Sequence, residues 1–433
     1  MKDCEVVFLI PGFLGFEHLA DYTYFADRVA VALRAALSQR VRADGPELRV
    51  LPVPIPPTAS FATRQHALAK TLVRRAQAIA RSEQLHISGI HLVGHSAGGV
   101  DAHLLSLERP LDPETQWHNF DGVDVFWLRE RLRSVISIAS PHQGTCLSLD
   151  PLARMLASGD LMHLLGRVPL ALKELLQLVA ALPALVADAE LPELLAGVLN
   201  SPSGHEFIRS LWSSRDLIND LTPAAALERY RRGGRALPIL RRSFVTVAGL
   251  TVSSRQSALG SLRHGPSARQ RHSDAAPLSA NAPTAGPDAL FLFLSTLTSG
   301  RGSGALDSQT LAPFLPGSAQ RITDALRDPQ RVITANPELV PQYVDGALND
   351  GVVNSARQLI DPSDPNELAA VVVADHFDVI GHYDRSFWVT DARTGHEHAQ
   401  TIVSGLLHSG SEFRDSQFFA LIDRLCAELA PLL

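Results

Sequence analysis

The sequence predicts an α/β protein in which a mostly parallel central sheet is flanked by helices. Six short apolar and β-branched runs predict the strands, at 6–10, 48–53, 90–93, 135–139, 244–248 and 369–374. Helix-period stretches at 25–37 and 64–80 separate the early strands, and this alternation is typical of a parallel sheet covered on both faces. The 433 residues, 45% of them hydrophobic and 19% charged, suffice for one large core with insertions or for two domains.

The amino-terminal segment carries no secretory signal pattern. Only the five apolar residues 6–10 precede Pro11, whereas a signal peptide needs an apolar stretch of about 7–15 residues and a small-residue cleavage site. No segment reaches the roughly 18 apolar residues of a membrane span. We therefore expect a cytoplasmic protein without a transmembrane segment. The net charge of −6 leaves no basic surface for nucleic acid, so we expect no nucleic-acid partner.

The turn after the first strand, Pro11-Gly12-Phe13-Leu14-Gly15, is a candidate half of an oxyanion hole. In strand–turn–helix sites for acyl transfer, one backbone N–H comes from such a loop and the other from the residue after the nucleophile. We therefore predict the backbone N–H groups of Phe13 and Ala97 as the donors. Taken alone, the turn would be a simple loop.

The third predicted strand runs into Gly94-His95-Ser96-Ala97-Gly98, a G-x-S-x-G pattern. Small residues at its two ends let the backbone turn tightly enough to lift the serine hydroxyl clear of the sheet. A free serine is a poor nucleophile, so Ser96 predicts chemistry only if a base and an orienting acid lie nearby. The alternative is a tight strand–helix turn without chemistry. The apolar strand before the motif and the helix-like run 100–107 after it disfavour that interpretation.

The acid and the base should follow Ser96 in the order Asp, His, each just beyond a strand. Asp350 lies in the turn-forming Asn-Asp-Gly after the strand 244–248 and its long insertions. His376 comes two residues after the strand 369–374. We predict Asp350 as the acid and His376 as the base. The reserve candidates are Asp345 for the acid and His382 for the base.

Two insertions interrupt the alternation of strands and helices. The first is rich in Leu and Ala, and within it Leu172, Leu175, Leu176, Val179 and Leu182 share one helix face. This apolar stripe packs either onto the sheet, as a structural cap, or against substrate, as a mobile lid. The second insertion has almost no large apolar side chains and predicts a disordered surface loop. The division is 1–145 for the first part of the core, 146–238 for the helical cap or lid, 239–252 for a core strand, 253–287 for the disordered loop, 288–345 for a helical and loop insertion, and 346–433 for the last part of the core.

Five short motifs together carry a resemblance to a known family. They are Pro-Gly-Phe-Leu-Gly at 11–15, Gly-His-Ser-Ala-Gly-Gly at 94–99, Ser-Pro-His-Gln-Gly-Thr at 140–145, Asn-Asp-Gly-Val-Val-Asn at 349–354 and Asp-His-Phe-Asp-Val-Ile-Gly at 375–381. In this order they resemble the α/β-hydrolases of the bacterial lipase and esterase type, and they are most similar to the thermoalkalophilic lipases. The resemblance implies the α/β-hydrolase fold. It also implies Ser96 as nucleophile, Asp350 as acid, His376 as base, and Phe13 and Ala97 as oxyanion donors.

The same resemblance raises the question of metals. Those lipases carry a zinc-binding insertion before the nucleophile, and its His/Asp pattern is not found here. Their calcium site uses an acidic residue two positions after the catalytic His, where this chain has Asp378, and another farther on, near Asp384. Two such carboxylates with carbonyl oxygens could hold Ca²⁺. The interpretation we favour is a helix-capping Asp378 and a solvated Asp384, with no cofactor required and no metal in the site.

The leading functional hypothesis is a serine carboxylic-ester hydrolase, a lipase or esterase. It would act on small hydrophobic esters with apolar acyl chains through an acyl-enzyme, and the cap could contact a lipid interface. One alternative is an acyltransferase that passes the same acyl group to an alcohol other than water. A second alternative is a catalytically silent interaction protein of the same fold, which the three filled triad positions disfavour. Fold and triad do not define the acyl chain or the alcohol.

Overall fold

The computed structural model describes residues 1–149, 216–248 and 315–433, apart from gaps of up to six residues, together with a few positions from 291 to 299. Most of the predicted cap at 146–238, including its apolar stripe, lies outside the described residues. The predicted disordered loop at 253–287 lies wholly outside them. The domain boundaries of these two segments therefore stay predictions.

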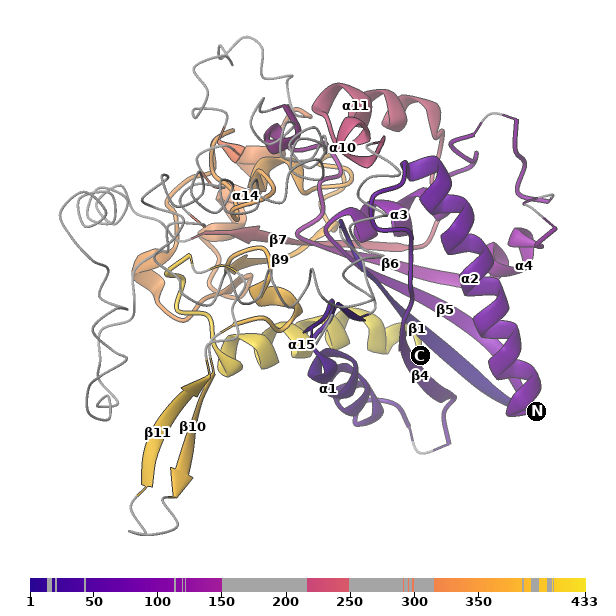
Figure 1. The fold of residues 1–433 in the computed structure, drawn as a ribbon, viewed down its shortest axis with the longest axis horizontal. Coiled ribbons are helices and arrows are strands. Elements are labelled where there is room, and N and C mark those ends of the chain that lie inside the picture. Colours follow the sequence, from indigo (N-terminus) through magenta and orange to yellow (C-terminus); the bar gives the residue numbers. More distant parts are fainter. Residues whose placement is uncertain are drawn as a thin grey trace, which may run out of the picture.

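Seven strands form the central sheet, in the order β4-β1-β5-β6-β7-β9-β8, and all neighbours are parallel (Figure 1). The strands are β1 (Lys2–Ile10), β4 (Glu47–Pro52), β5 (Leu85–His95), β6 (Leu132–Ile138), β7 (Leu240–Val247), β8 (Val332–Ile333) and β9 (Leu368–Val373). Each of the six predicted runs overlaps one strand, so the predicted sheet is confirmed. The seventh, β8, is an edge strand from the segment 288–345 that was predicted as helical and loop. Its two residues are too few to show a period in the sequence.

Helices cover both faces of the sheet (Figure 1). On one face α1 (Asp27–Ser38) and α15 (Asp415–Leu429) pack against a shared apolar cluster that includes Val7, Leu9 and Val372. The opposite face carries α2 (Phe61–Ser82), α3 (Ala97–Leu105), α4 (Val125–Arg131) and α14 (Ser318–Leu326). Alternate residues of each strand point to opposite faces, so a strand buried on both sides must be apolar throughout. All six residues of β9 are buried accordingly.

The remaining elements are short. They are α10 (Asp216–Asp220), α11 (Pro223–Arg232), the hairpin of β2 (His18–Leu19) and β3 (Tyr22–Thr23), the hairpin of β10 (Arg385–Thr390) and β11 (Glu397–Ile402), and 3₁₀ turns at Cys146–Leu149, Pro337–Leu339, Ser355–Arg357, Asp378–Ile380 and Ala430–Leu432. Thr222 caps α11 by accepting the Ala225 N–H at 3.3 Å, with Pro223 at the first helical position. In the part of the chain that the structure describes, no helix is long and apolar enough to cross a membrane.

The strand directions determine where a site can form. Because the strands are parallel, the carboxyl ends of β5, β7 and β9 lie at one edge of the sheet. Ligands of open α/β sheets bind at this edge, since the loops that follow the strands meet there. The architecture is that of an α/β-hydrolase core: a parallel sheet between helices, with a serine between the end of β5 and the start of α3.

Candidate active site

Ser96 occupies a strained turn between the last residue of β5 and the first residue of α3. Its backbone has φ 55° and ψ −132°, a region that residues with a side chain rarely adopt. Two glycines make the turn possible. A Cβ on Gly94 would lie 2.3 Å from the Gly98 carbonyl oxygen, and one on Gly98 would lie 2.2 Å from the Ile10 carbonyl oxygen. The motif therefore requires glycine at both positions, and the strain is of the kind that holds a nucleophile exposed.

The loop that carries Asp350 lies against the carboxyl end of β7, although the two are far apart in the sequence. The Ala248 N–H donates to the Asn349 carbonyl at 3.2 Å, and the His376 N–H donates to the Asp350 carbonyl at 3.0 Å. These two backbone hydrogen bonds join the ends of β7 and β9 through the loop. The side chain of Asp350 is completely buried at this point. Its position beside both strand ends explains how a residue distant from β7 in sequence reaches the site.

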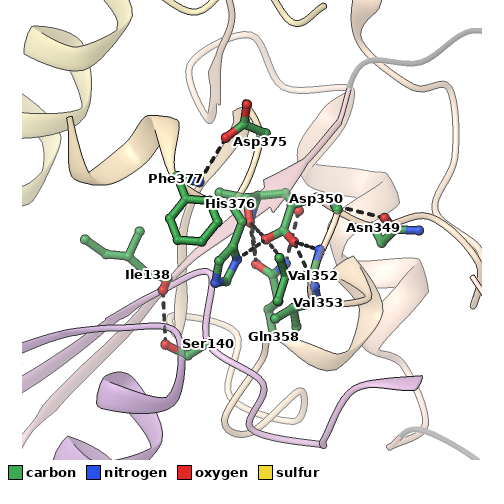
Figure 2. A network of polar contacts seen from close by, with 12 residues as sticks. Ile138, Ser140, Asn349, Asp350, Val352, Val353, Gln358, Asp375, His376 and Phe377 are labelled. Carbon is green, nitrogen blue, oxygen red and sulfur yellow. Dashed lines mark hydrogen bonds and ion pairs between the residues drawn. The ribbon is translucent and has the colours of Figure 1, made fainter. Parts of the chain in front are cut away.

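The carboxylate of Asp350 accepts a full set of hydrogen bonds, which offsets the cost of burying its charge (Figure 2). Oδ1 accepts the backbone N–H groups of Val352 at 3.0 Å and Val353 at 2.8 Å. Oδ2 accepts from the Thr246 hydroxyl at 2.5 Å and from Gln358 Nε2 at 3.2 Å. The third partner of Oδ2 is the imidazole of His376. These contacts leave the carboxylate a single orientation.

His376 lies just beyond β9, and its ring is directed at the carboxylate of Asp350 (Figure 2). The distance from its Nδ1 to Asp350 Oδ2 is 3.0 Å, and only 2% of the residue is exposed. A carboxylate can only accept, so the proton of the neutral ring lies on Nδ1. The lone pair is then on Nε2, which is the state that a general base requires.

A second pair of buried residues holds the backbone of His376. His95 Nε2 lies 2.8 Å from the His376 carbonyl oxygen, and His95 Nδ1 lies 2.8 Å from the Tyr24 hydroxyl. Burial lowers the pKa of His95 well below its usual value, and the neighbouring His376 lowers it further, so the ring is neutral. Since a carbonyl only accepts, His95 donates through Nε2 and accepts the Tyr24 proton at Nδ1. The result is a directed chain from Tyr24 through His95 to His376.

The structure places Ser96 at the same edge of the sheet as this pair, without a hydrogen bond to the base. The Ser96 N–H donates to the Ile138 carbonyl at 2.9 Å, and the rings of His95 and His376 are 4.6 Å apart between centroids. Within the described residues, no hydrogen bond joins the Ser96 hydroxyl to His376. Catalytic hydrogen bonds are often long in structures without substrate and shorten in the substrate complex. The assignment of Ser96, Asp350 and His376 as a triad stays a prediction.

The proposed oxyanion donors flank the serine. A Cβ on Gly12 would lie 2.5 Å from the Ser96 Cβ, so the backbone of the 11–13 turn runs directly against the nucleophile. Phe13 follows in this turn and packs, partly buried, against the apolar cluster that includes Ala97. Ala97 is the first residue of α3, and an amide at that position has no acceptor within the helix. The roles of Phe13 and Ala97 remain predictions.

The reserve candidates have other partners. Asp345 Oδ1 accepts the backbone N–H groups of Ala347 at 2.9 Å and Leu348 at 2.8 Å, which shapes the loop before Asp350. The Nε2 of His382 lies 3.1 Å from the Thr23 carbonyl oxygen and 3.0 Å from that of Tyr24. A ring nitrogen between two carbonyl oxygens must donate, so His382 contributes to the fold at this position.

The structure describes one of the two carboxylates of the predicted calcium site. Asp378 accepts the Asp375 N–H at 3.0 Å and the Ser411 hydroxyl at 3.2 Å, so its carboxylate braces the turn after His376. Asp384 lies outside the described residues. Within the described ranges, no group of three or more His, Cys, Asp or Glu side chains is arranged to hold a metal ion. Both the calcium site and the alternative for these two residues stay predictions.

Sequence reasoning missed three side chains that support the site. Thr246 and Gln358 hold the carboxylate of Asp350, and Tyr24 donates to His95. Thr246 lies in the buried strand β7, where a polar residue is a weak signal that a partner exists. Neither Tyr24 nor Gln358 belongs to a pattern that indicates such a role.

Comparisons with known proteins bear on the fold. No protein-family model matches the chain, and no curated protein matches it. Among solved structures, EstA from Clostridium botulinum is 18% identical with a TM-score of 0.42, covering 87% of this chain and 82% of that one. Lipase 1 from Pelosinus fermentans is 17% identical with a TM-score of 0.38, covering 88% and 94%. The metagenomic carboxyl esterase MGS0156 is 14% identical with a TM-score of 0.37, covering 99% and 75%. The chain is thus similar in outline to lipases and esterases, while similarity to the thermoalkalophilic lipases in particular stays a prediction.

Proposed function

We propose that this protein is a serine carboxylic-ester hydrolase of the lipase or esterase type. The observation that supports it most is the oriented Asp350–His376 pair, 3.0 Å between carboxylate and ring, at the sheet edge where Ser96 occupies its strained turn. A serine on a sharp strand–helix turn with a His–Asp pair beside it is the arrangement that acyl transfer requires.

In the proposed reaction, Ser96 Oγ attacks the ester carbonyl carbon while His376 Nε2 takes its proton. The carbonyl oxygen becomes an oxyanion that accepts hydrogen bonds from the Phe13 and Ala97 N–H groups. Asp350 holds the Nδ1 proton and stabilises the imidazolium. His376 then protonates the departing alkoxide, which leaves an acyl-enzyme. Water, activated by the same histidine, attacks this ester and releases the acid and free Ser96.

Substrates of this proposed enzyme are small hydrophobic esters with apolar acyl chains. The proposal rests on the leucine- and alanine-rich composition of residues 146–238, which offers more apolar surface than a surface insertion needs. Each methylene that the acyl chain buries should add about 0.8 kcal/mol of binding until the pocket is full. Contact of this segment with a lipid interface belongs to the same proposal.

The test is labelling with a fluorophosphonate, combined with hydrolysis of p-nitrophenyl esters from acetate to medium chains. We expect stoichiometric labelling of the wild type, no labelling of Ser96→Ala, and turnover of that variant reduced to a residual level. Ser140→Ala is the matched control, because the Ser140 hydroxyl is buried in the neighbouring loop and donates to the Ile138 carbonyl at 3.1 Å. A Ser96→Ala protein that labels like the wild type would exclude Ser96 as the nucleophile. An unchanged rate across acyl lengths would exclude the apolar acyl pocket.

A further inference from the structure

A cavity of about 370 Å³ lies beside α3. Its walls come from α3, from α11, from the loop after β6 and from the start of β7. Those that bear on its chemistry are Val100, His103, Leu104, His142, Arg229 and Arg241. Ser96, Asp350 and His376 are not among the lining residues.

The cavity extends from the edge formed by the carboxyl ends of the strands, where Ser96 lies, towards the opposite edge of the sheet. Arg241 is paired with Val135 in β6, three residues before Ile138, which is level with the end of β5. At about 3.3 Å per residue, this places the start of that wall roughly 10 Å from the edge where Ser96 lies. The lining thus runs from Val100, one helical turn after Ser96 in α3, to Arg241 at the start of β7, and it includes no residue of the proposed triad.

Two buried side chains present polar atoms to the cavity without a protein partner. His142 is 9% exposed, and within the described residues neither of its ring nitrogens has a hydrogen-bond partner. Arg229 is 8% exposed; its Nη1 donates to the Asp220 carbonyl at 2.8 Å, while its Nη2 has no partner among those residues. A buried donor without an acceptor destabilises the fold, and it does so more strongly when it is charged. A neutral His142 has one N–H, and this donor and Arg229 Nη2 are therefore available to a ligand with acceptor atoms.

The charge of the lining has one dominant sign. Among the described residues, Arg229, Arg235 and Arg241 line the cavity together with a single carboxylate, Asp361. Asp361 already accepts the Ser363 N–H at 3.0 Å. Burial lowers the pKa of His103 to about 3, and the charges of Arg241 and Arg229 act in the same direction. Burial likewise holds the pKa of His142 well below its usual value. At neutral pH the cavity thus presents guanidinium groups and neutral imidazoles.

The rest of the lining is largely apolar. It includes Val100, Leu104 and Leu107 from α3 and its end, together with Ala226 and Ile360. An inorganic anion would leave such a surface in contact with water. A ligand that has both an oxyanion and a short hydrocarbon chain would cover both the polar and the apolar lining, and its binding would strengthen with each buried methylene.

We propose that this cavity binds a small amphipathic anion, with its oxyanion against His142, Arg229 and Arg241 and its hydrocarbon chain against Val100 and Leu104. The oxyanion is a carboxylate or a phosphate, both of which accept hydrogen bonds from guanidinium groups. The proposal does not depend on the proposed hydrolase activity, because the site shares no residue with the triad.

The experiment is isothermal titration calorimetry of the full chain with octanoate, octyl phosphate, octanol and acetate. We expect one site for octanoate or octyl phosphate, and the tighter of the two identifies the oxyanion. Octanol lacks the charge and acetate lacks the chain, so each should bind at least about tenfold more weakly. Octanol binding as tight as octanoate, or no binding by either anion, would overturn the proposal.

Variants locate the site. Arg241→Gln removes a half-buried cation at the start of β7, and His142→Phe keeps a ring while removing its nitrogens. Each should weaken binding of the anion at least about tenfold. Arg231→Gln is the matched control, because Arg231 is exposed on α11 and does not line the cavity. Binding that persists in both folded cavity variants, or that is lost after fluorophosphonate labelling of Ser96, would place the anion elsewhere and refute the proposal. If the wild type binds the anion but Ser96 is not labelled by the fluorophosphonate, only the proposed hydrolase activity is refuted.

Discussion

Replacing Asp350 with asparagine isolates the role of one oxygen atom in the site. Oδ1 accepts two backbone N–H groups, from Val352 and Val353. An asparagine must therefore place its carbonyl oxygen at that position, since an NH₂ group there would face two donors. Its NH₂ group then takes the place of Oδ2 and faces Nδ1 of His376. Two donors cannot share this 3.0 Å contact, so the imidazole must move its proton to Nε2.

The fold should tolerate this change. The Thr246 hydroxyl lies 3.1 Å from Gln358 Oε1, so it can donate there and accept from the new amide. Gln358 Nε2 keeps its second acceptor, the Thr246 carbonyl oxygen at 3.2 Å. The expected loss in the free energy of unfolding is therefore that of one impaired buried hydrogen bond, about 1–3 kcal/mol. Thermal denaturation checks that the variant is folded at the assay temperature.

Catalysis should suffer far more than stability. With the proton on Nε2, His376 cannot accept the proton of Ser96. The equivalent change in a serine protease lowers kcat by about 10⁴, which corresponds to about 5.5 kcal/mol of barrier, and we expect a loss of that order for Asp350→Asn. The assay is the kcat of p-nitrophenyl ester hydrolysis by folded protein.

The matched control for this experiment is Asp345→Asn. An amide oxygen can replace Oδ1 of Asp345 as the acceptor of the two backbone N–H groups, so kcat should stay within about threefold. If the folded Asp350→Asn protein keeps more than a tenth of the wild-type kcat, the orienting role of Asp350 is wrong. If Asp345→Asn shows the large loss instead, the acid was misassigned.

Three further predictions concern histidines and the residue that holds one of them. His376→Ala should abolish hydrolysis while His382→Ala lowers the melting temperature but keeps activity; the opposite result in kinetic assays would make His382 the base. Tyr24→Phe removes the donor to His95 and should lower kcat about tenfold with little change in KM, whereas an unchanged kcat would show that this contact only supports the fold. The third concerns pH, because burial lowers the pKa of His103 from 6.5 to about 3. Below pH 6.5 the unfolded chain binds a proton at this residue that the folded chain does not. The free energy of unfolding therefore decreases as the pH is lowered, by about 2 kcal/mol at pH 5. In denaturant titrations His103→Phe should remove this part of the pH dependence, and an equally acid-sensitive variant would contradict the shifted pKa.

The sheet was readable from the sequence because its signals are local. Apolar runs such as 90–93 and 369–374 predict buried strands within a few residues, since a strand covered on both faces has no polar side. The strand β8 escaped prediction because two residues show no period. The hairpin of β10 and β11 is joined by pairing between its own two strands and not by the central sheet, so the alternation of strands and helices did not indicate it.

The candidate site could be predicted only where local geometry required particular residues. Gly94 and Gly98 are needed because a Cβ at either position would overlap backbone atoms, so the motif itself indicated the turn at Ser96. No such requirement separates Asp350 from Asp345, since both lie in short turns five residues apart. The Asn-Asp-Gly turn and the family resemblance favoured Asp350, and its role as the acid still awaits the asparagine variants.

The sequence by itself determined six of the seven strands of the central sheet, the turn at Ser96 and the order in which candidate acid and base follow it, because these depend on periodicity and steric fit over a few residues. Only the tertiary structure decided which distant side chains meet there. Thr246 and Gln358 hold Asp350, and Tyr24 reaches His95 from a segment 71 residues earlier. Such contacts depend on how parallel strands bring their carboxyl ends to one edge and on which loops then return to it. Packing over the whole chain decides that return, and no short stretch of sequence encodes it.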